Sequence, residues 1–308
     1  MPSVAFETVD VFAEAPFGGN PLAVMTDARG LSAAEMQAIA REFNYSESTF
    51  ITPPADPANT ARVRIFTPTD EIPFAGHPNV GTAFVLARTG SLFGRDVGDV
   101  MRFEEDAGIV EVDVVRRGGA VAGATIRAPR SLEIGEEIAV DTVAGCASLD
   151  GEAIVSARHR PVFASVGLPF AFAEVASLDF LGNASPNVAA FREAHRLHPN
   201  PIDRFSLFLY VRIAAGRVRA RMFAPLSNVF EDPATGSASA ALGGLLSSLE
   251  RDDDGYRLTI EQGVEMGRPS LIEVGVSARG GRQSISVSGH CVPVMRGTFA
   301  LPESGRVS

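Results

Sequence analysis

Apolar and polar residues alternate along most of this chain, which is the pattern of strands with one buried face. Amphipathic or small-residue segments interrupt the alternation and predict helices at 31–43, about 80–88, 187–197 and 238–249. Strands are predicted at 4–13, 22–25, 49–52, 61–66, within 101–128 (two or three strands), 161–166, 171–175, 205–213, 218–223, 257–262, 271–277, 284–287 and 292–301. The region from 129 to about 150 is rich in turns and has only a weak pattern. This mixture predicts an α+β fold.

Two segments half a chain apart resemble each other. Residues 62–68 read Arg-Val-Arg-Ile-Phe-Thr-Pro, and residues 219–225 read Arg-Ala-Arg-Met-Phe-Ala-Pro. A short polar loop and a helix of small residues follow each copy. The spacing of 157 residues, about half the chain, indicates a duplicated domain rather than a repeat array. We place the crossover between the two halves near residue 129.

The second small-residue helix has a polar start. Residues 230–242 begin with acidic and turn residues and continue as small apolar ones. Asp232 is expected to cap this helix, with Pro233 in its first turn. A buried helix start presents N–H groups and a positive dipole end that favour a carboxylate, although a capped helix packed in a core is the alternative. With such a helix in each half, the two helix starts would meet at an interdomain cleft, where small-ligand sites usually lie.

Four polar residues are candidates for chemistry. Glu47 lies between an amphipathic helix and a strand, where a half-buried carboxylate can have a raised pKa and act as a general acid or base; the alternative is an exposed loop residue. His77 lies where the first small-residue helix begins, and could instead only bond its own helix start. Asp232 and Ser237 occupy the matching place in the second half, with capping as the alternative role. Ser237 is not in a nucleophile elbow, so no serine hydrolase is predicted.

Composition and charge exclude several functions. The net charge is -10, the pI is about 5.1, and no basic block is present, so neither nucleic acid nor a membrane surface is an expected partner. All 27 basic residues are arginines, which excludes pyridoxal phosphate bound through lysine and a P-loop lysine. No apolar run approaches 18 residues and no leader pattern precedes the first strand, so we expect a cytoplasmic protein.

Histidines and cysteines show no metal-binding pattern. The five histidines are scattered, and only His195 and His198 are closely spaced, without a third ligand. Cys146 and Cys291 are far apart and are expected to be buried, reduced side chains. No metal site is therefore predicted.

Six ordered segments resemble the PhzF-like phenazine biosynthesis isomerase family, whose members have the diaminopimelate-epimerase-like fold. These segments are VDVF at 9–12 with FGGNPLAV at 17–24, FNYSESTF at 43–50, IFTP at 65–68 with EIPFAGHP at 71–78, SVGLPF at 165–170, EDPATGSA at 231–238, and QGVEMGRPS at 262–270. The resemblance implies two pseudo-symmetric domains, each a mostly antiparallel sheet or barrel wrapped around a central helix. It also implies that the last strand returns to the first domain, which gives domains of 1–128 with about 293–308, and 129–292.

The resemblance further implies a set of roles. Glu47 matches the family's general acid/base, which would move a proton from one carbon to another and shift a double bond. His77, Asp232 and Ser237 match the other catalytic positions of the family. The backbone N–H groups at Gly76 and Gly236 are expected to hold the carboxylate of a small-molecule substrate.

The same resemblance implies that no metal or organic cofactor is needed and that the protein is a homodimer. Epimerases and racemases of this fold place a cysteine at each helix start. Here Cys146 and Cys291 lie elsewhere, so an epimerase or racemase is disfavoured. A non-catalytic metabolite-binding protein is the remaining alternative, and it would be indifferent to Glu47→Gln.

Overall fold

The computed structural model describes residues 3–250, 255–279 and 282–301. The chain divides into two compact units, Met1–Ile126 with Ser288–Ser308, and Arg127–Val287. The sequence placed these boundaries at 128/129 and at about 293. Nothing in the described ranges is a helix with the length and hydropathy that a bilayer crossing requires.

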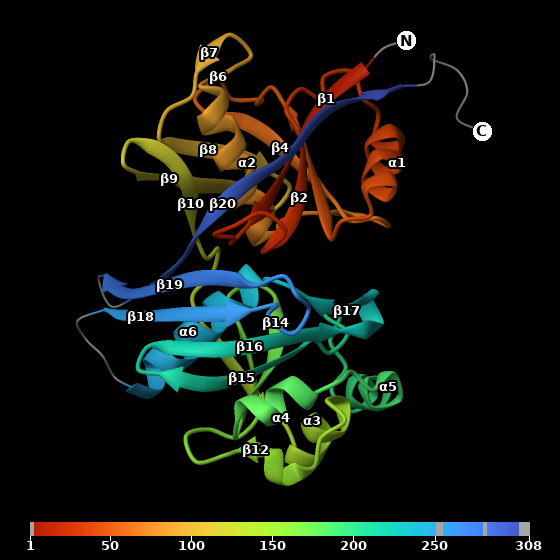
Figure 1. Cartoon of the computed structure of the whole chain (residues 1–308), viewed down its shortest axis with the longest axis vertical. Helices are drawn as coiled ribbons and strands as arrows, with labels where there is room; N and C mark the ends of the chain where they lie inside the picture. Colours follow the sequence, from red (N-terminus) through yellow and green to blue (C-terminus); the bar gives the residue numbers. More distant parts are fainter. Residues whose placement is uncertain (1–2, 251–254, 280–281, 302–308) are drawn as a thin grey trace. The chain divides into compact units, whose positions relative to one another are not determined.

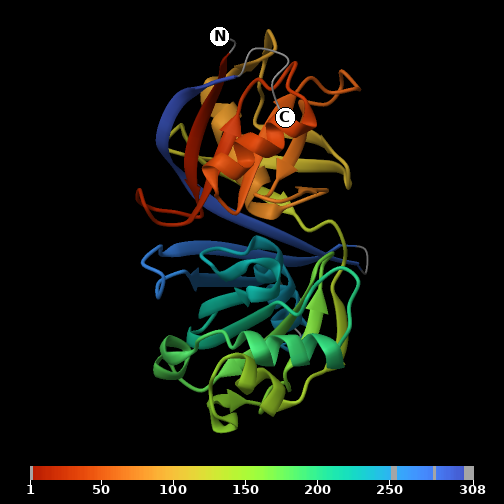
Figure 2. The same ribbon diagram turned by 90° about the vertical axis from the view of Figure 1, so that its right-hand side faces the viewer.

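The elements of the first unit follow the chain in order (Figure 1). They are β1 (Ser3–Val11), β2 (Asn20–Met25), α1 (Ala33–Phe43), β3 (Glu47–Thr52), β4 (Ala61–Phe66), β5 (Glu71–Ile72), α2 (Gly76–Thr89), β6 (Ser91–Leu92), β7 (Arg95–Asp96), β8 (Val100–Glu105), β9 (Gly108–Arg117) and β10 (Ala120–Arg127). The long final strand β20 (Arg282–Ala300) runs antiparallel beside β1, as Figures 1 and 2 both show.

The second unit carries the remaining elements. They are β11 (Glu133–Glu137), α3 (Val140–Cys146), η1 (Gly151–Ala153), β12 (Ile154–Val155), β13 (Val162–Ser165), β14 (Pro169–Val175), α4 (Leu178–Asn183), α5 (Val188–Leu197), β15 (Leu207–Ala214), β16 (Arg217–Ala224), η2 (Pro225–Ser227), β17 (Val229–Asp232), α6 (Gly236–Glu250), β18 (Tyr256–Gln262) and β19 (Ser270–Arg279).

The two units share one order of strand pairing. In the first unit β1–β2 is antiparallel, β2–β3 parallel, β3–β4 antiparallel, β4–β8 parallel and β8–β9 antiparallel. In the second unit β13–β14, β14–β15, β15–β16, β16–β18 and β18–β19 repeat that order. The two Arg-x-Arg segments lie on the equivalent strands β4 and β16. The predicted α+β class with two similar halves is confirmed.

A small-residue helix lies against the strands of each unit. Helix α2 packs on β1, β2, β3 and β9, and α6 packs on β13, β14, β18 and β19. A Cβ at Gly81 would lie 2.6 Å from Leu22 Cδ2, and one at Gly243 would lie 2.5 Å from Val274 Cγ1. Glycine at these two positions therefore allows the sheets to close on the helices, which explains why both helices lack large side chains there.

Each unit also has a core outside its central helix. In the first unit, Met36 and Ile39 of α1 pack in a cluster with Phe50 and Phe66. In the second unit, α3, α4 and α5 cover one side of β14 and β15, with Phe191 and Phe205 fully buried or nearly so. These packed layers hold fixed the strands from which the candidate residues project.

Several sequence predictions are wrong in detail. Asp232 does not cap α6: it ends β17, and α6 begins at Gly236, where the Thr235 carbonyl accepts the first helical hydrogen bond from Ser239 N at 2.9 Å. Glu47 is not in a loop, because pairing with Leu22 of β2 extends β3 back to it.

Two other regions also differ from the prediction. The strands expected at 284–287 and 292–301 form the single strand β20 (Arg282–Ala300), because β1 supplies backbone partners along its second part. The weakly patterned region after residue 129 contains the short strand β11 and the helix α3. That helix is only seven residues long, and its N-cap position, Ala139, has no side chain that could signal a helix start.

Candidate active site

Glu47 is a buried carboxylate at the beginning of β3. Its side chain is 18% exposed, and its Oε2 atom is buried without a hydrogen-bond partner among the described residues. Burial raises the pKa of Glu47 from 4.5 to about 7, and a hydrogen bond from the Ser46 side chain opposes this rise. The Ser46 hydroxyl oxygen also lies 2.9 Å from Asn20 Oδ1, so Glu47 and Asn20 compete for its one hydrogen. A carboxyl group of this kind can both hold and release a proton near neutral pH.

His77 lies next to Glu47. It is the second residue of α2 and is 6% exposed, with Nε2 placed 3.5 Å from Glu47 Oε2. This separation is longer than an ordinary hydrogen bond, and catalytic contacts of this kind often tighten when substrate binds. The structure thus brings together, within one unit, a proton-exchanging carboxyl group and an imidazole that are 30 positions apart in the chain.

Gly76 begins α2 beside this pair. The N-cap residue Ala75 is extended and offers no side-chain acceptor to the first-turn N–H groups. Instead Asn79 Nδ2 donates back to the Ala75 carbonyl at 2.9 Å, which fixes the path by which the chain enters the helix. The first-turn N–H groups of α2 therefore receive no side-chain cap from Ala75, and the carboxylate-binding role of Gly76 stays a prediction.

The candidates of the second unit lie in one tightly bonded turn. Asp232 is 8% exposed, and its Oδ2 accepts a hydrogen bond from Thr235 Oγ1 at 2.5 Å. The Gln262 amide donates to the Asp232 carbonyl at 2.7 Å and accepts from Thr235 N at 3.1 Å. The Ser270 hydroxyl donates to the Pro233 carbonyl at 2.7 Å. These bonds fix the Asp232 carboxylate relative to the start of α6.

Gly236 and Ser237 are the first two residues of α6. Gly236 is buried and Ser237 is partly exposed. Asp232, Gly236 and Ser237 are thus brought together in the second unit, as Gly76, His77 and Glu47 are in the first.

The sequence interpretation gave no role to Gln262 or Ser270, although both lie in a segment that carries the family resemblance. A completely buried glutamine at the end of a strand is recognisable only in the fold, because its partners are 27 and 30 residues away. Gly263, with φ +71°, allows the close approach: a Cβ there would lie 2.7 Å from the Pro233 carbonyl oxygen. These residues support the turn rather than face a substrate.

A second buried carboxyl group, Glu105, was also missed. It is 8% exposed, and neither oxygen makes a hydrogen bond of ordinary geometry among the described residues. Burial raises its pKa to about 8, the Asn79 amide opposes the rise, and the charge of Asp106 adds to it. A signal was present, because Met101, Phe103 and Glu105 occupy alternate inward positions of β8.

The substitution Glu105→Gln is expected to make the free energy of unfolding less dependent on pH. Glu105 keeps its proton in the folded state up to about pH 8, whereas the unfolded chain loses it near 4.5, so folding stability falls as the pH rises between these values. One pKa unit corresponds to about 1.4 kcal/mol, so the variant should gain about 2–4 kcal/mol over wild type between about pH 5 and about pH 9.

Denaturant unfolding at several pH values measures this difference. Glu111→Gln is the matched control, since that carboxylate is 50% exposed on the neighbouring strand. If the free energy of unfolding changed with pH in the same way for wild type and Glu105→Gln, Glu105 would not have a raised pKa in the folded protein.

No three His, Cys, Asp or Glu side chains in residues 3–250, 255–279 and 282–301 lie close enough together to hold a metal ion. Both cysteines are buried, and burial raises the pKa of Cys146 to about 12 and that of Cys291 further still. Neither thiol is suited to act as a base near neutral pH.

A sheet packed around a central helix is repeated in the two units, with carboxyl groups and a histidine near the helix starts. Residues 9–297 match the family of phenazine biosynthesis-like proteins, PhzC-PhzF. The chain belongs to this family.

Two of the similar proteins are named as isomerases. An uncharacterised isomerase of Mesorhizobium japonicum is 38% identical over 301 residues, which cover 95% of this chain and 97% of the relative. The trans-2,3-dihydro-3-hydroxyanthranilate isomerase of Pseudomonas chlororaphis is 35% identical over 298 residues, covering 95% and 98%. The chain is therefore an isomerase of the PhzF-like type, acting on a small molecule.

Solved structures agree on the fold. The PhzF-family phenazine biosynthesis protein of Bacillus anthracis has a TM-score of 0.87 and 24% identity, covering 98% of this chain and all of that one. A hydroxyproline epimerase of Agrobacterium vitis has a TM-score of 0.63 and 14% identity, covering 97% and 91%. The predicted diaminopimelate-epimerase-like architecture is confirmed at the level of the fold.

Proposed function

We propose that this isomerase moves a proton between two carbons of a small unsaturated carboxylate, with Glu47 as its general acid/base. The observation that carries the proposal is the buried Glu47 carboxyl group, with a pKa of about 7 and Oε2 located 3.5 Å from His77 Nε2. Most carboxylates in proteins are fully ionised at neutral pH and are weak bases, so a site that raises the pKa this far favours proton transfer.

The proposed reaction balances without a co-reactant. Glu47 removes a proton from one carbon, the electron pair of that C–H bond becomes part of a shifted double bond, and Glu47 returns the proton to a second carbon. His77, Asp232 and Ser237 orient the substrate and assist the proton, and the N–H groups at Gly76 and Gly236 hold its carboxylate. The reaction is an isomerisation in which substrate and product have the same composition.

Two features support this function over epimerisation or racemisation. The four catalytic candidates, Glu47, His77, Asp232 and Ser237, include no thiol. Cys146 and Cys291 are buried in apolar surroundings that oppose ionisation. We further propose a cytoplasmic homodimer, for which the family resemblance is the support.

The test substrate is trans-2,3-dihydro-3-hydroxyanthranilate, the compound after which the Pseudomonas relatives are named. We expect the purified protein to convert it, without added metal or organic cofactor, into a product of unchanged mass, followed by NMR and mass spectrometry. Related cyclic and open-chain unsaturated carboxylates define the specificity in the same assay. Saturable binding of these compounds without turnover of any of them would instead indicate a metabolite-binding protein.

The pH dependence of kcat/KM should report the ionisation of Glu47. The first step requires the carboxylate form, so kcat/KM is expected to fall tenfold per pH unit well below pH 7 and to level off above it, with an apparent pKa of about 7. Initial rates at low substrate concentration over a range of pH measure this. An apparent pKa near that of an ordinary glutamate would contradict a role for the buried carboxyl group.

A further inference from the structure

The second unit contains a cavity of about 540 Å³ outside the candidate active site. One wall is a face of α5 formed by Val188, Arg192 and His195, and the others are Arg204 and the η2 residues Pro225 and Leu226. Helix α5 contacts η2. The volume is in the range typical of small-molecule sites, and no candidate catalytic residue lines it.

The cavity is basic, although the protein is acidic overall. Arg192, His195 and Arg204 line it, and its lining includes no Asp or Glu. Within the part of the chain that the structure describes, neither arginine has a carboxylate partner. Arg204 Nη1 makes only a marginal contact with the Leu226 carbonyl at 3.5 Å. Both arginines are exposed, so the cavity is open to solvent, and their two guanidinium groups line it with no carboxylate among the lining residues.

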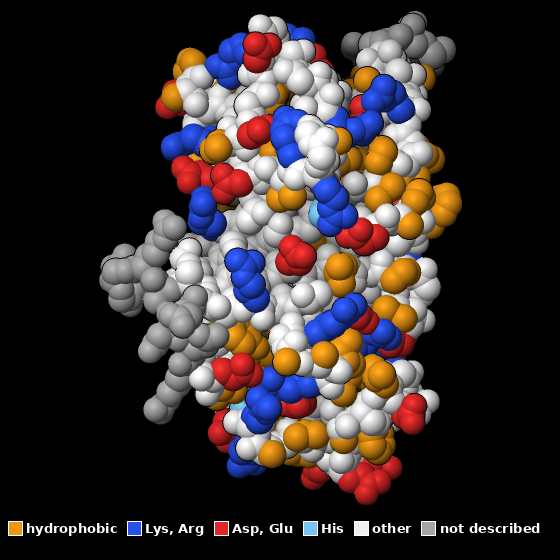
Figure 3. Space-filling model, turned by 60° about the vertical axis from the view of Figure 1, so that its left-hand side comes forward, with side chains coloured by type: hydrophobic (Ala, Val, Ile, Leu, Met, Phe, Trp, Pro, Cys, Tyr) orange, Lys and Arg blue, Asp and Glu red, His pale blue; other side chains and the backbone are white. Residues whose placement is uncertain are grey.

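Neighbouring arginines behave differently. On the same helix, Arg196 is paired with Glu193 through contacts of 2.6 and 2.8 Å. In the first unit, Arg116 of β9 pairs with Asp99. Figure 3 shows a face on which basic and acidic side chains are interspersed. Arg192 and Arg204 thus differ from Arg196 in having no carboxylate partner among the described residues.

His195 adds a further polar group to the same wall. The spacing of Val188, Arg192 and His195 places them on one face of α5. The Nδ1 atom of His195 is buried and makes no hydrogen bond with any described residue. Because this nitrogen is not accessible to solvent, it does not face the open cavity, and His195 contributes to the wall through the rest of its ring.

We propose that this cavity binds a small organic anion, whose carboxylate or phosphate group lies between Arg192 and Arg204. Val188, Pro225 and Leu226 would contact the apolar part of the ligand, and the His195 imidazole and the Asn228 amide would complete its polar contacts. Arginine guanidinium groups suit both acidic groups, because their planar N–H donors match paired oxygens. This site is separate from the one that carries the proposed isomerisation, and its existence does not depend on that reaction.

The test is NMR titration of the histidine side chains in the full-length protein. The chain has five histidines, so their Cε1–H signals can be assigned by substitution, and His77 and His195 report the two sites separately. Benzoate and phenyl phosphate are the probes, representing a carboxylate and a phosphate on an apolar body. The expected result is a saturable shift of the His195 signal with at least one probe below about 10 mM.

Variants locate the binding. Arg192→Gln and Arg204→Gln should each weaken the titration of His195 by about tenfold or more, since hydrogen bonds to charged groups are the strong ones. Arg196→Gln, on the same helix but paired with Glu193, should leave it unchanged. The stronger probe identifies which acidic group the site prefers.

Three outcomes would overturn the proposal: no shift of His195 with either probe, a shift that never saturates, or equal binding by all three variants. Shifts confined to His77 would place the probe at the candidate active site instead. Thermal unfolding of each variant shows whether a loss of binding reflects a loss of the fold.

Discussion

Glu47→Gln is expected to lower turnover of a carboxylate substrate by about 10²- to 10⁴-fold, the usual contribution of one general acid/base. Glutamine keeps the shape of the side chain but cannot take up and return a proton. Because Oε2 of Glu47 is buried beside His77 Nε2, no solvent-exposed carboxylate can easily replace it. Steady-state kinetics of wild type and variant measure the loss in kcat and kcat/KM.

Glu42→Gln is the matched control for this experiment. Glu42 lies five residues upstream on α1 and is exposed, so its loss should leave kcat within about twofold. Glu47→Gln should also remain folded, because the group it replaces is already partly protonated at neutral pH. A folded Glu47→Gln variant with activity equal to that of Glu42→Gln would show that another group moves the proton.

The second large effect is expected from Arg221→Met, which should lower the free energy of unfolding by about 3–5 kcal/mol. Arg221 is 7% exposed and makes a two-pronged ion pair with Glu231, with both N···O distances at 2.8 Å. Its Nη1 also donates to the carbonyl groups of Leu181 and Ala184, at 3.0 and 2.6 Å. Removing the guanidinium leaves a buried carboxylate and these carbonyl groups without their donor.

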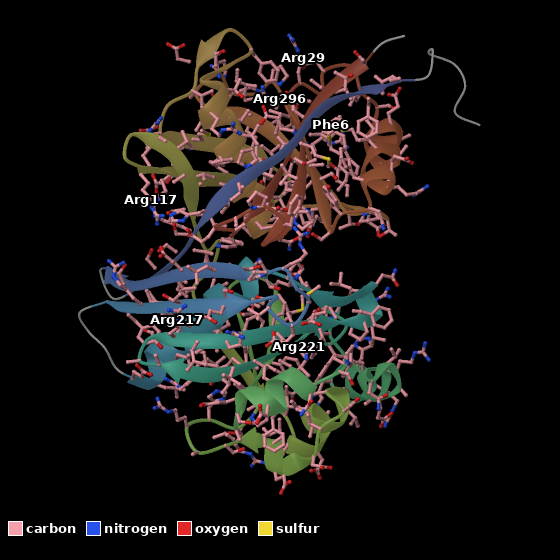
Figure 4. All side chains as sticks on the ribbon, in the orientation of Figure 1. Phe6, Arg29, Arg117, Arg217, Arg221 and Arg296 are labelled. Atoms are coloured by element: carbon pink, nitrogen blue, oxygen red, sulfur yellow. The ribbon has the colours of Figure 1, made fainter. Side chains whose placement is uncertain are left out.

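Arg217→Met provides the control on the same strand. Arg217 is 49% exposed and pairs with Glu261, so its loss should cost about 0–1 kcal/mol. Figure 4 labels both arginines on the second unit, at different points along β16. Urea unfolding compares the two variants. Similar losses would mean that the Arg221 network does not stabilise the fold beyond an ordinary surface pair.

The Arg221 network is also close to the candidate site in sequence. Glu231, its partner, directly precedes Asp232 on β17. A variant that loosens this strand is therefore expected to lower kcat as well as stability, whereas Arg217→Met should affect neither strongly. This coupling explains why a buried ion pair can be retained at a position where an apolar residue would also fill the space.

Local signals in the sequence predicted much of the fold correctly. The predicted helix at 31–43 begins with a capping box, in which Ser32 accepts from Glu35 N and the Glu35 carboxylate accepts from Ser32 N at 2.8 Å. The Arg-x-Arg repeat identified the duplication, because the same pattern of inward and outward residues is needed on β4 and β16. These features depend on neighbours within a few residues, or on one comparison of two segments.

Features that depend on distant partners were not predictable in this way. The turn after Asp232 is closed by the Gln262 side chain rather than by a helix cap, so local capping rules gave Asp232 the wrong structural role. Glu47 belongs to β3 only because β2 pairs with it. Arg192 of α5 and Arg204, in the loop before β15, line the same cavity. No spacing along the chain indicates that these two residues share a site.

Hydrogen exchange during turnover in deuterated water tests the central claim, proton transfer by Glu47, most directly. We predict that wild type and Glu42→Gln place solvent deuterium on the substrate or product carbons that exchange the proton, as read by NMR and mass spectrometry. Glu47→Gln should be folded and should place none in the same time. Deuterium incorporation by Glu47→Gln at the wild-type rate would contradict the account.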